Sequence, residues 1–195
     1  KIGVVFQNPK TQFFTTDVYS ELAFTMENAG IEPVEIRKRI KEAAEQFSLS
    51  ELLDASVFVL SGGEKQRVAI ACATMLSHDL FLFDEPSSNL DEEALQKIAA
   101  AIRLLKEQGK TIVIAEHRLS YLTGIADRYL LLAEGRLVTE YTSEALLSHT
   151  PQQIHNLGLR RINEPQFELA INETEGASFS ADLIATNLQV TYRRQ

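Results

Sequence analysis

Cysteine is nearly absent from the chain: Cys72 stands alone, and no apolar run reaches the roughly 18 to 20 residues that cross a bilayer. A lone cysteine excludes an internal disulfide framework, fits a reducing compartment and is expected here as a small core residue. No signal-peptide pattern opens the sequence. We therefore expect a cytosolic protein without a membrane-spanning segment of its own.

Basic residues are also scarce. The 195 residues include 19 Lys and Arg against 27 Asp and Glu, which gives a net charge of -8. Phosphate backbones bind basic surfaces, so nucleic acid is not expected as a partner. Hydrophobic residues make up 45% and charged residues 24% of the chain, which is typical of a soluble globular protein with one substantial core.

Uniformly apolar runs and helical stripes alternate along the middle of the chain. The runs at 2–6, 80–83 and 111–115 lack polar alternation, which is typical of buried strands in a parallel sheet. This alternation predicts an α/β fold with a mainly parallel sheet flanked by helices. The other expected elements are helices from Asp17 to Gly30, from Pro33, from Ser61 to about Leu76 and ahead of Gly109, a hairpin at 129–140 and a helical tail at 142–159.

The strongest local signal is the run Ser61-Gly62-Gly63-Glu64. Ser61 and Glu64 have the spacing of a capping box, so one interpretation is simply a well-capped helix. Two glycines, each costing about 1 kcal/mol relative to alanine in a helix, argue that something approaches the backbone closely. The positive end of the helix dipole favours an anion such as phosphate there.

A second signal is the acid pair Asp84-Glu85, which ends the apolar run at 80–83. The carboxyl edge of a parallel sheet is where α/β proteins bind ligands. Adjacent like charges are unfavourable unless a cation or a reaction uses them, although two solvated acids remain the alternative. Asp84 is suited to hold Mg²⁺, and Glu85 to orient or deprotonate an attacking water.

Two further polar residues are expected at the same edge. Gln7 is the first polar residue after the strand at 2–6, and His117 follows the strand at 111–115. A lone histidine after a strand is more often structural than catalytic. The convergence of both residues with the acid pair on one edge favours a functional interpretation.

In order and spacing, these elements resemble the ATP-binding cassette (ABC) ATPases, from Ile2 to about Leu147. The signature motif and Walker B in this order are highly specific to that family, whereas Gln7 or His117 alone would be weak. The matches are Gln7 to the Q-loop, Leu60–Gln66 to the signature motif with Glu64 where glutamine is commoner, Phe81–Glu85 to Walker B, Ser88–Asp91 to the D-loop and His117 to the switch histidine.

The resemblance implies a P-loop NTPase-like fold with a helical signature subdomain at about 17–76, and ATP and Mg²⁺ as cofactors. It implies a second cassette and a transmembrane transport subunit as partners. The implied catalytic residues are Glu85, as general base, and His117, at the γ-phosphate. Asp84 and Gln7 are the implied metal ligands, and Gln7 also couples the metal site to the transport subunit. The implied nucleotide-binding residues are Gln7, Ser61, Gly62, Gly63, Glu64 and Asp91, of which Ser61, Gly62 and Gly63 contact ATP held by the partner cassette.

Two segments resemble a narrower branch. Gln7–Phe14 and Ala115–Leu119 are similar to the ATPases of energy-coupling-factor importers for vitamins and metal ions. That likeness implies a cytoplasmic protein bound peripherally to the inner face of the cell membrane. Because Leu183–Tyr192 resembles the first strand of a second cassette, we expect a partial ATPase domain at 1–159, a linker at 160–178 and the start of a second domain at 179–195.

The family's phosphate loop, G-x-x-x-x-G-K followed by Ser or Thr, does not occur in the 195 residues. Gly109-Lys110-Thr111 imitates only its end, and joins an expected helix to a strand rather than a strand to a helix. We interpret this tripeptide as a helix stop. The expected fold is therefore incomplete at its N-terminus, with the phosphate loop before Lys1.

Two other functions remain open. A soluble twin-cassette protein of the translation-factor type usually carries Ser-His-Asp at the switch, where Glu116-His117-Arg118 stands here. A non-catalytic regulatory cassette would keep the signature motif but would have no use for the pair Asp84-Glu85. We favour the ATP-binding subunit of an importer over both.

Without a phosphate loop, the 195-residue chain alone is expected to hydrolyse no ATP. Phosphate release by the purified chain, compared with the Glu85→Gln variant, checks this expectation. Turnover that disappears in the variant would contradict it.

Overall fold

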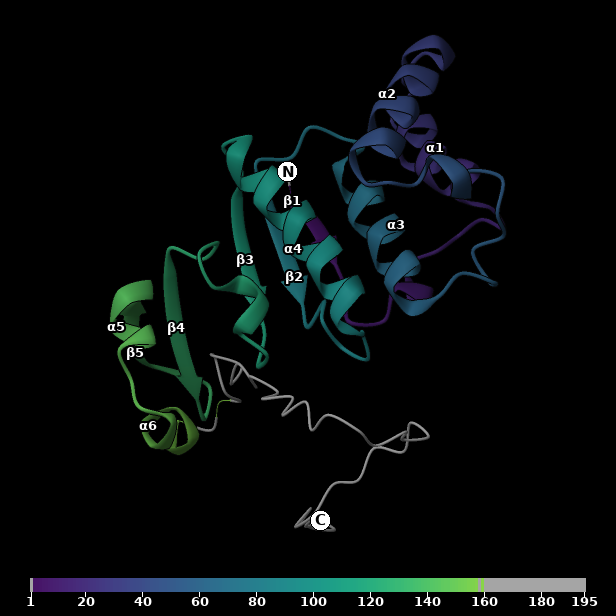
Figure 1. The fold of residues 1–195 in the computed structure, drawn as a ribbon. Coiled ribbons are helices and arrows are strands. Elements are labelled where there is room, and N and C mark those ends of the chain that lie inside the picture. The colour runs from purple at the N-terminus through teal and green to yellow at the C-terminus, as the bar shows by residue number, and fades with distance from the viewer. Residues whose placement is uncertain (1, 158, 160–195) are drawn as a thin grey trace, which may run out of the picture. The chain divides into compact units, whose positions relative to one another are not determined.

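The computed structural model describes residues 2–157 and 159 of the chain (Figure 1). The expected linker at 160–178 and second domain at 179–195 lie outside these residues. The described elements are β1 (Ile2–Val5), the 3₁₀ helix η1 (Pro9–Thr11), α1 (Val18–Asn28), α2 (Pro33–Gln46), the 3₁₀ helix η2 (Ser50–Leu52), α3 (Gly62–Thr74), β2 (Leu80–Asp84), α4 (Glu92–Glu107), β3 (Thr111–Ala115), the 3₁₀ helix η3 (Ser120–Leu122), β4 (Arg128–Ala133), β5 (Arg136–Thr142), α5 (Ser143–Leu147) and α6 (Pro151–Asn156).

Three of the strands form a parallel sheet in the order β1-β2-β3. Val5 lies beside Phe83, and Asp84 at the end of β2 pairs with Ala115 at the end of β3. Since all three strands run in the same direction, the residues that follow them meet at one edge. The α/β class with a parallel sheet flanked by helices is confirmed.

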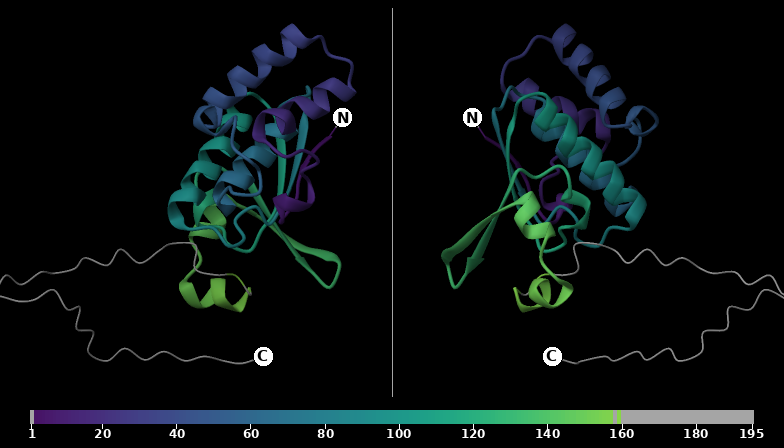
Figure 2. Two further views of the ribbon diagram at one scale, coloured as in Figure 1. Left: turned by 90° about the vertical axis from the view of Figure 1, so that its right-hand side faces the viewer. Right: turned by 60° about the vertical axis from the view of Figure 1, so that its left-hand side comes forward.

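Helices α3 and α4 pack on one face of this sheet (Figure 2). Val5, Phe81 and Phe83 belong to the core on that side and are at most 2% exposed. On the opposite face Ile2 and Val113 are 52% and 53% exposed. The expectation of strands buried on both faces is therefore wrong for β1 and β3, whose outer side chains are open to solvent.

The helical part of the chain begins where the sequence predicted. The Asp17 carboxylate accepts a hydrogen bond from Ser20 N at 2.8 Å and caps α1, while Pro33 opens α2. Helices α1, α2 and α3 fall within 17–76, the range expected for a helical subdomain, and the division into domains stays a prediction. Within residues 2–157 and 159, none of the helices is long and apolar enough to cross a membrane.

The segment after the sheet differs in part from its prediction. β4 and β5 form the expected antiparallel hairpin, with Glu134 and Gly135 at positive φ in the turn. The expected helical tail at 142–159 is instead two short helices, α5 and α6. Thr150 caps α6 and Pro151 opens it, and a proline there cannot continue the helix that precedes it.

Gly109 ends α4, as the sequence predicted. Its φ of 75° is one that other residues adopt at a cost, and Lys110 N donates to Leu105 O at 3.1 Å to close the last turn. β3 begins at Thr111 directly afterwards. Gly109-Lys110-Thr111 is thus a helix stop ahead of a strand.

α3 and α4 approach each other closely where α3 begins. A Cβ atom added at Gly63 would lie 2.6 Å from Ala94 Cβ, whereas one at Gly62 would meet Leu90 Cδ2 at an ordinary 3.5 Å. The close approach predicted from the glycine pair therefore exists at Gly63. Within the chain, the group that approaches is Ala94.

Exposed apolar side chains on the sheet and hairpin should make the 195-residue chain self-associate in isolation. Leu132 and Val138 of the hairpin, at 66% and 59% exposed, add to the open face of the sheet. Replacing Val4 and Val113 by threonine should raise the monomer fraction in sedimentation, whereas Val34→Thr on the exposed surface of α2 should not. A fully monomeric wild-type chain at tens of micromolar would contradict this.

Gly63→Ala should destabilise the chain by about 1–3 kcal/mol, because the added methyl group must push α3 away from Ala94. Gly62→Ala is the matched control and should be neutral or stabilise by up to about 1 kcal/mol, since alanine favours helix over glycine. Urea unfolding followed by circular dichroism at low protein concentration measures both. Equal midpoints for the two variants would refute the packing argument.

Candidate functional site

Polar side chains from three strand ends meet at the carboxyl edge of the sheet. Glu85 Oε2 accepts hydrogen bonds from Gln7 Nε2 at 3.0 Å and Ser88 Oγ at 3.2 Å. His117 Nδ1 lies 3.8 Å from the same oxygen. The structure thus brings together Gln7, Glu85 and His117, which the sequence placed at one edge without showing that they touch.

The backbone at Glu85 turns its side chain out of the strand pattern. Its φ is 41°, in the left-handed region, while its N–H continues the sheet ladder to Ala115 O at 2.9 Å. Such a conformation costs a non-glycine residue of order 1 kcal/mol, and functional sites are among the places where it recurs. Ser88 N donates to Glu85 O at 3.1 Å and closes the turn that brings the Ser88 hydroxyl back to the carboxylate.

Asp84 and Gln7 are chemically suited to hold Mg²⁺. Asp84 is the exposed last residue of β2, and the Gln7 amide nitrogen is used by Glu85 and Ser88, which leaves its oxygen as a ligand. The described residues contain no group of three or more His, Cys, Asp or Glu that could hold a metal. Mg²⁺ commonly binds through one or two protein oxygens together with water and substrate phosphates, so this smaller set fits.

The start of α3 is a second, separate group. Glu64 N donates to Ser61 Oγ at 3.3 Å and Ser61 N donates to Glu64 Oε2 at 2.7 Å, which confirms the capping box. The hydrogen bond with Ser61 holds the pKa of Glu64 below its ordinary value. In the described part of the chain, no hydrogen bond or ion pair joins Ser61, Gly62, Gly63 or Glu64 to Glu85.

Asp91 has a structural task in this chain. Its carboxylate accepts a hydrogen bond from Ala94 N at 2.8 Å and caps α4. Asn89, two residues earlier, has a φ of 60° and turns the chain into the helix. The loop from Ser87 to Asp91 therefore leads directly from Glu85 to the helix that packs on Gly63.

The sequence placed Ser88 in the D-loop match and Glu116 in the run Ala115–Leu119, but it gave neither side chain a task at the site. Ser88 holds the Glu85 carboxylate, and Glu116 is buried with its side chain only 1% exposed. The signals for Glu116 in the sequence are its position between the end of a strand and His117 and its place in the run Ala115–Leu119. Its partners cannot be read from local patterns.

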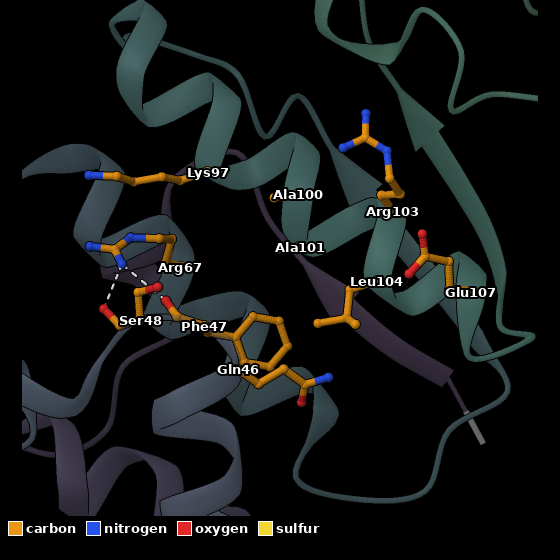
Figure 3. Close-up of a pocket in the computed structure, with 10 residues that line it drawn as sticks. All are labelled: Gln46, Phe47, Ser48, Arg67, Lys97, Ala100, Ala101, Arg103, Leu104 and Glu107. Atoms are coloured by element: carbon orange, nitrogen blue, oxygen red, sulfur yellow. Dashed lines mark hydrogen bonds between the residues drawn. The ribbon is translucent and has the colours of Figure 1, made fainter.

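A cavity of about 310 Å³ lies away from this edge, between the C-terminal end of α2 and the helices α3 and α4 (Figure 3). Arg67 reaches into this junction and donates from Nη1 to the carbonyls of Phe47 and Ser48, at 3.0 and 2.7 Å. None of the residues that the sequence assigned to a site lines it. The cavity is therefore a gap in the packing of α2, α3 and α4.

Comparison with known proteins places these features in a family. The family model described as ABC transporter matches residues 1–88. A putative ABC transporter ATP-binding protein of Treponema denticola is 41% identical over 159 residues, which are 82% of this chain and 32% of that protein. The energy-coupling factor transporter ATP-binding protein EcfA of Methanosarcina acetivorans is 40% identical over 147 residues, 75% of this chain and 53% of that protein.

A solved structure shows the same fold. It is that of CbiO1 from Clostridium perfringens, described as part of the ABC transporter complex CbiONQ, with a TM-score of 0.70 and 31% identity over 82% of this chain and 63% of that one. The chain thus spans about a third to a half of the length of the curated relatives named here. Its parallel sheet, its motif order and these matches together show that the chain belongs to the ABC transporter family, as an ATPase domain of that family.

Proposed function

We propose that this chain belongs to the ATP-hydrolysing component of an importer that takes up a vitamin or a metal ion through membrane partners. The observation that carries the proposal is the group formed by Gln7, Glu85, Ser88 and His117 at the carboxyl edge of the sheet. The similarity to EcfA and CbiO1 supports import over other uses of an ABC ATPase.

Glu85 is the proposed general base. Gln7 and Ser88 hold Oε2 from two directions, which fixes the plane of the carboxylate and leaves its other oxygen to accept a proton from an attacking water. His117 lies beside the same carboxylate, and its proposed role is to contact the terminal phosphate of ATP. Positioning is one of the main contributions that a protein makes to phosphoryl transfer, and it is the contribution proposed for this group.

Asp84 and Gln7 are the proposed Mg²⁺ ligands. A bound Mg²⁺ ion neutralises charge on the phosphates of the nucleotide. Because Gln7 also donates to Glu85, the proposed metal ligand and the proposed base are in direct contact. That linkage supports the proposed role of Gln7 in coupling the site to a transport subunit.

The start of α3 is proposed to serve a second nucleotide. The backbone N–H groups at Gly62 and Gly63 lie at the positive end of a 13-residue helix, and the Ser61 hydroxyl can still donate while it accepts from Glu64. Among the described residues no hydrogen bond joins these residues to Glu85, which supports a division in which Ser61, Gly62, Gly63 and Glu64, with Asp91 nearby, meet ATP held by another cassette. Under this proposal the active unit contains two cassettes, in one chain or in two.

The proposed location is the cytoplasm, at the inner face of the cell membrane, with a transmembrane transport subunit as partner. Phe6 and Phe14, on either side of η1, are 49% and 75% exposed. Phe14 stacks on Phe24 of α1 with ring centroids 5.1 Å apart, so exposed aromatic surface flanks Gln7 along the chain. Such a surface is typical of a contact with another protein.

Glu85→Gln in the full-length protein, assembled with its membrane partners, should lower ATP turnover by at least about 100-fold while ATP still binds. Glu93→Gln is the matched control, because this carboxylate is 79% exposed on α4 and its one hydrogen-bond partner among the described residues is Lys97. It should leave turnover within about twofold of the wild type. Phosphate release measures both variants, and undiminished turnover by Glu85→Gln would overturn the assignment of the base.

Import itself is tested with the same complex in lipid vesicles. Uptake of a labelled vitamin or metal ion should require ATP and should be lost in the Glu85→Gln variant. Wild-type turnover that never drives uptake of any such solute would contradict the import proposal and leave the ATPase assignment intact.

A further inference from the structure

An acidic and a basic residue flank His117, and the side chains of both form hydrogen bonds with the same segment of the chain. Glu116 precedes the histidine and Arg118 follows it. Each makes hydrogen bonds to the stretch from Ser87 to Glu92, which begins two residues after Glu85. The proposed switch histidine and the loop beside the proposed base are therefore tied together on both sides.

Glu116 makes the first tie. Its Oε1 accepts from the backbone N–H groups of His117 and Arg118, at 2.9 and 3.1 Å. Its Oε2 accepts from Ser87 N at 3.3 Å and from the Tyr121 hydroxyl at 3.0 Å. One carboxylate oxygen thus binds the histidine loop and the other binds the loop after Glu85.

The Glu116 carboxylate is buried, so it must be stabilised by hydrogen-bond donors. The Glu116 side chain is 1% exposed, and removing a carboxylate from water is costly unless donors replace the water. Burial alone would raise the pKa of Glu116, but the hydrogen bonds from Ser87 and from the backbone of the histidine loop outweigh it and hold the pKa below its ordinary value. Glu116 is therefore a buried anion satisfied by donors from both loops.

Arg118 makes the second tie. Its Nη1 donates to Leu90 O at 3.3 Å and its Nη2 donates to Glu92 Oε2 at 2.9 Å. These contacts lie at the far end of the same loop, where α4 begins. Between the two ties, His117 turns its Nδ1 to within 3.8 Å of Glu85 Oε2.

We propose that Glu116 and Arg118 are positioning residues that fasten the His117 loop to the segment Ser87–Glu92, so that the switch histidine and the loop beside Glu85 move as one unit. The consequence for the reaction rests on the proposed ATPase function. A displacement of this loop, for example by a second cassette, would carry His117 with it. Without these hydrogen bonds, the His117 ring would no longer be held beside the Glu85 carboxylate.

Glu116→Gln separates the two halves of the tie. The amide oxygen of glutamine can accept from the histidine loop or from Ser87, but its nitrogen cannot accept on the other side. In either orientation one loop is released, although the side chain keeps its size. Tyr121→Phe is the matched control, because it removes one hydrogen bond of Glu116 and leaves both loops attached.

The first measurement is hydrogen exchange in the full-length protein with its partner subunits. In Glu116→Gln, amides at 87–90 or at 117–118 should exchange at least about tenfold faster, as expected when a buried hydrogen bond is lost. Arg118→Met should speed exchange at the end of this loop, and Tyr121→Phe should leave both segments as in the wild type. Unchanged exchange in Glu116→Gln would overturn the tie itself, whether or not the protein hydrolyses ATP.

The second measurement is steady-state ATP hydrolysis by the same complex. Glu116→Gln should lower kcat at least about tenfold and leave KM for ATP within about twofold, because alignment matters to the reaction more than to binding. Tyr121→Phe should change neither by more than about twofold. Faster exchange in Glu116→Gln combined with a wild-type kcat would overturn the positioning role, whereas a wild type without turnover would refute only the proposed function.

Discussion

Parallel pairing of β1, β2 and β3 is the constraint on which the rest of the structure depends. The hydrogen bond between Gln7 and Glu85 joins residues 78 positions apart, and only a common strand direction brings them to one edge. The same pairing sets His117 beside Glu85 and closes the ladder from Glu85 N to Ala115 O. A slip of one residue in β1 would turn its buried side chains outward and remove Gln7 from the group.

Much of this could be predicted because the signals are local. Apolar runs predicted the strands, Asp17 and Ser61 predicted helix starts, and Gly109 predicted a helix stop, since each of these effects acts within a few residues. The order of strands and helices was enough to place polar residues at the carboxyl edge. The distances between those side chains could not be predicted from the sequence, because they depend on backbone turns such as the one at Glu85.

The parts that sequence reasoning missed depend on contacts between distant segments. Glu116 accepts a hydrogen bond from Ser87, 29 positions away in the chain. The need for glycine at position 63 comes from Ala94, which lies on a different helix. Apolar strands were expected to be buried on both faces. An apolar sequence does not show whether another element covers each face of the sheet, and Val113 on the uncovered face is 53% exposed. Likewise the helical tail expected at 142–159 is divided into two helices, because Thr150 caps α6 and Pro151 begins it.

The central claim is that this sheet edge holds the reacting end of ATP. A structure of the full-length Glu85→Gln protein with ATP and Mg²⁺, in complex with its partner subunits, tests it most directly. The account predicts the terminal phosphate within reach of residue 85 through one water, with His117 beside it and the start of α3 facing a second nucleotide. A nucleotide bound away from the ends of β1, β2 and β3 would contradict it.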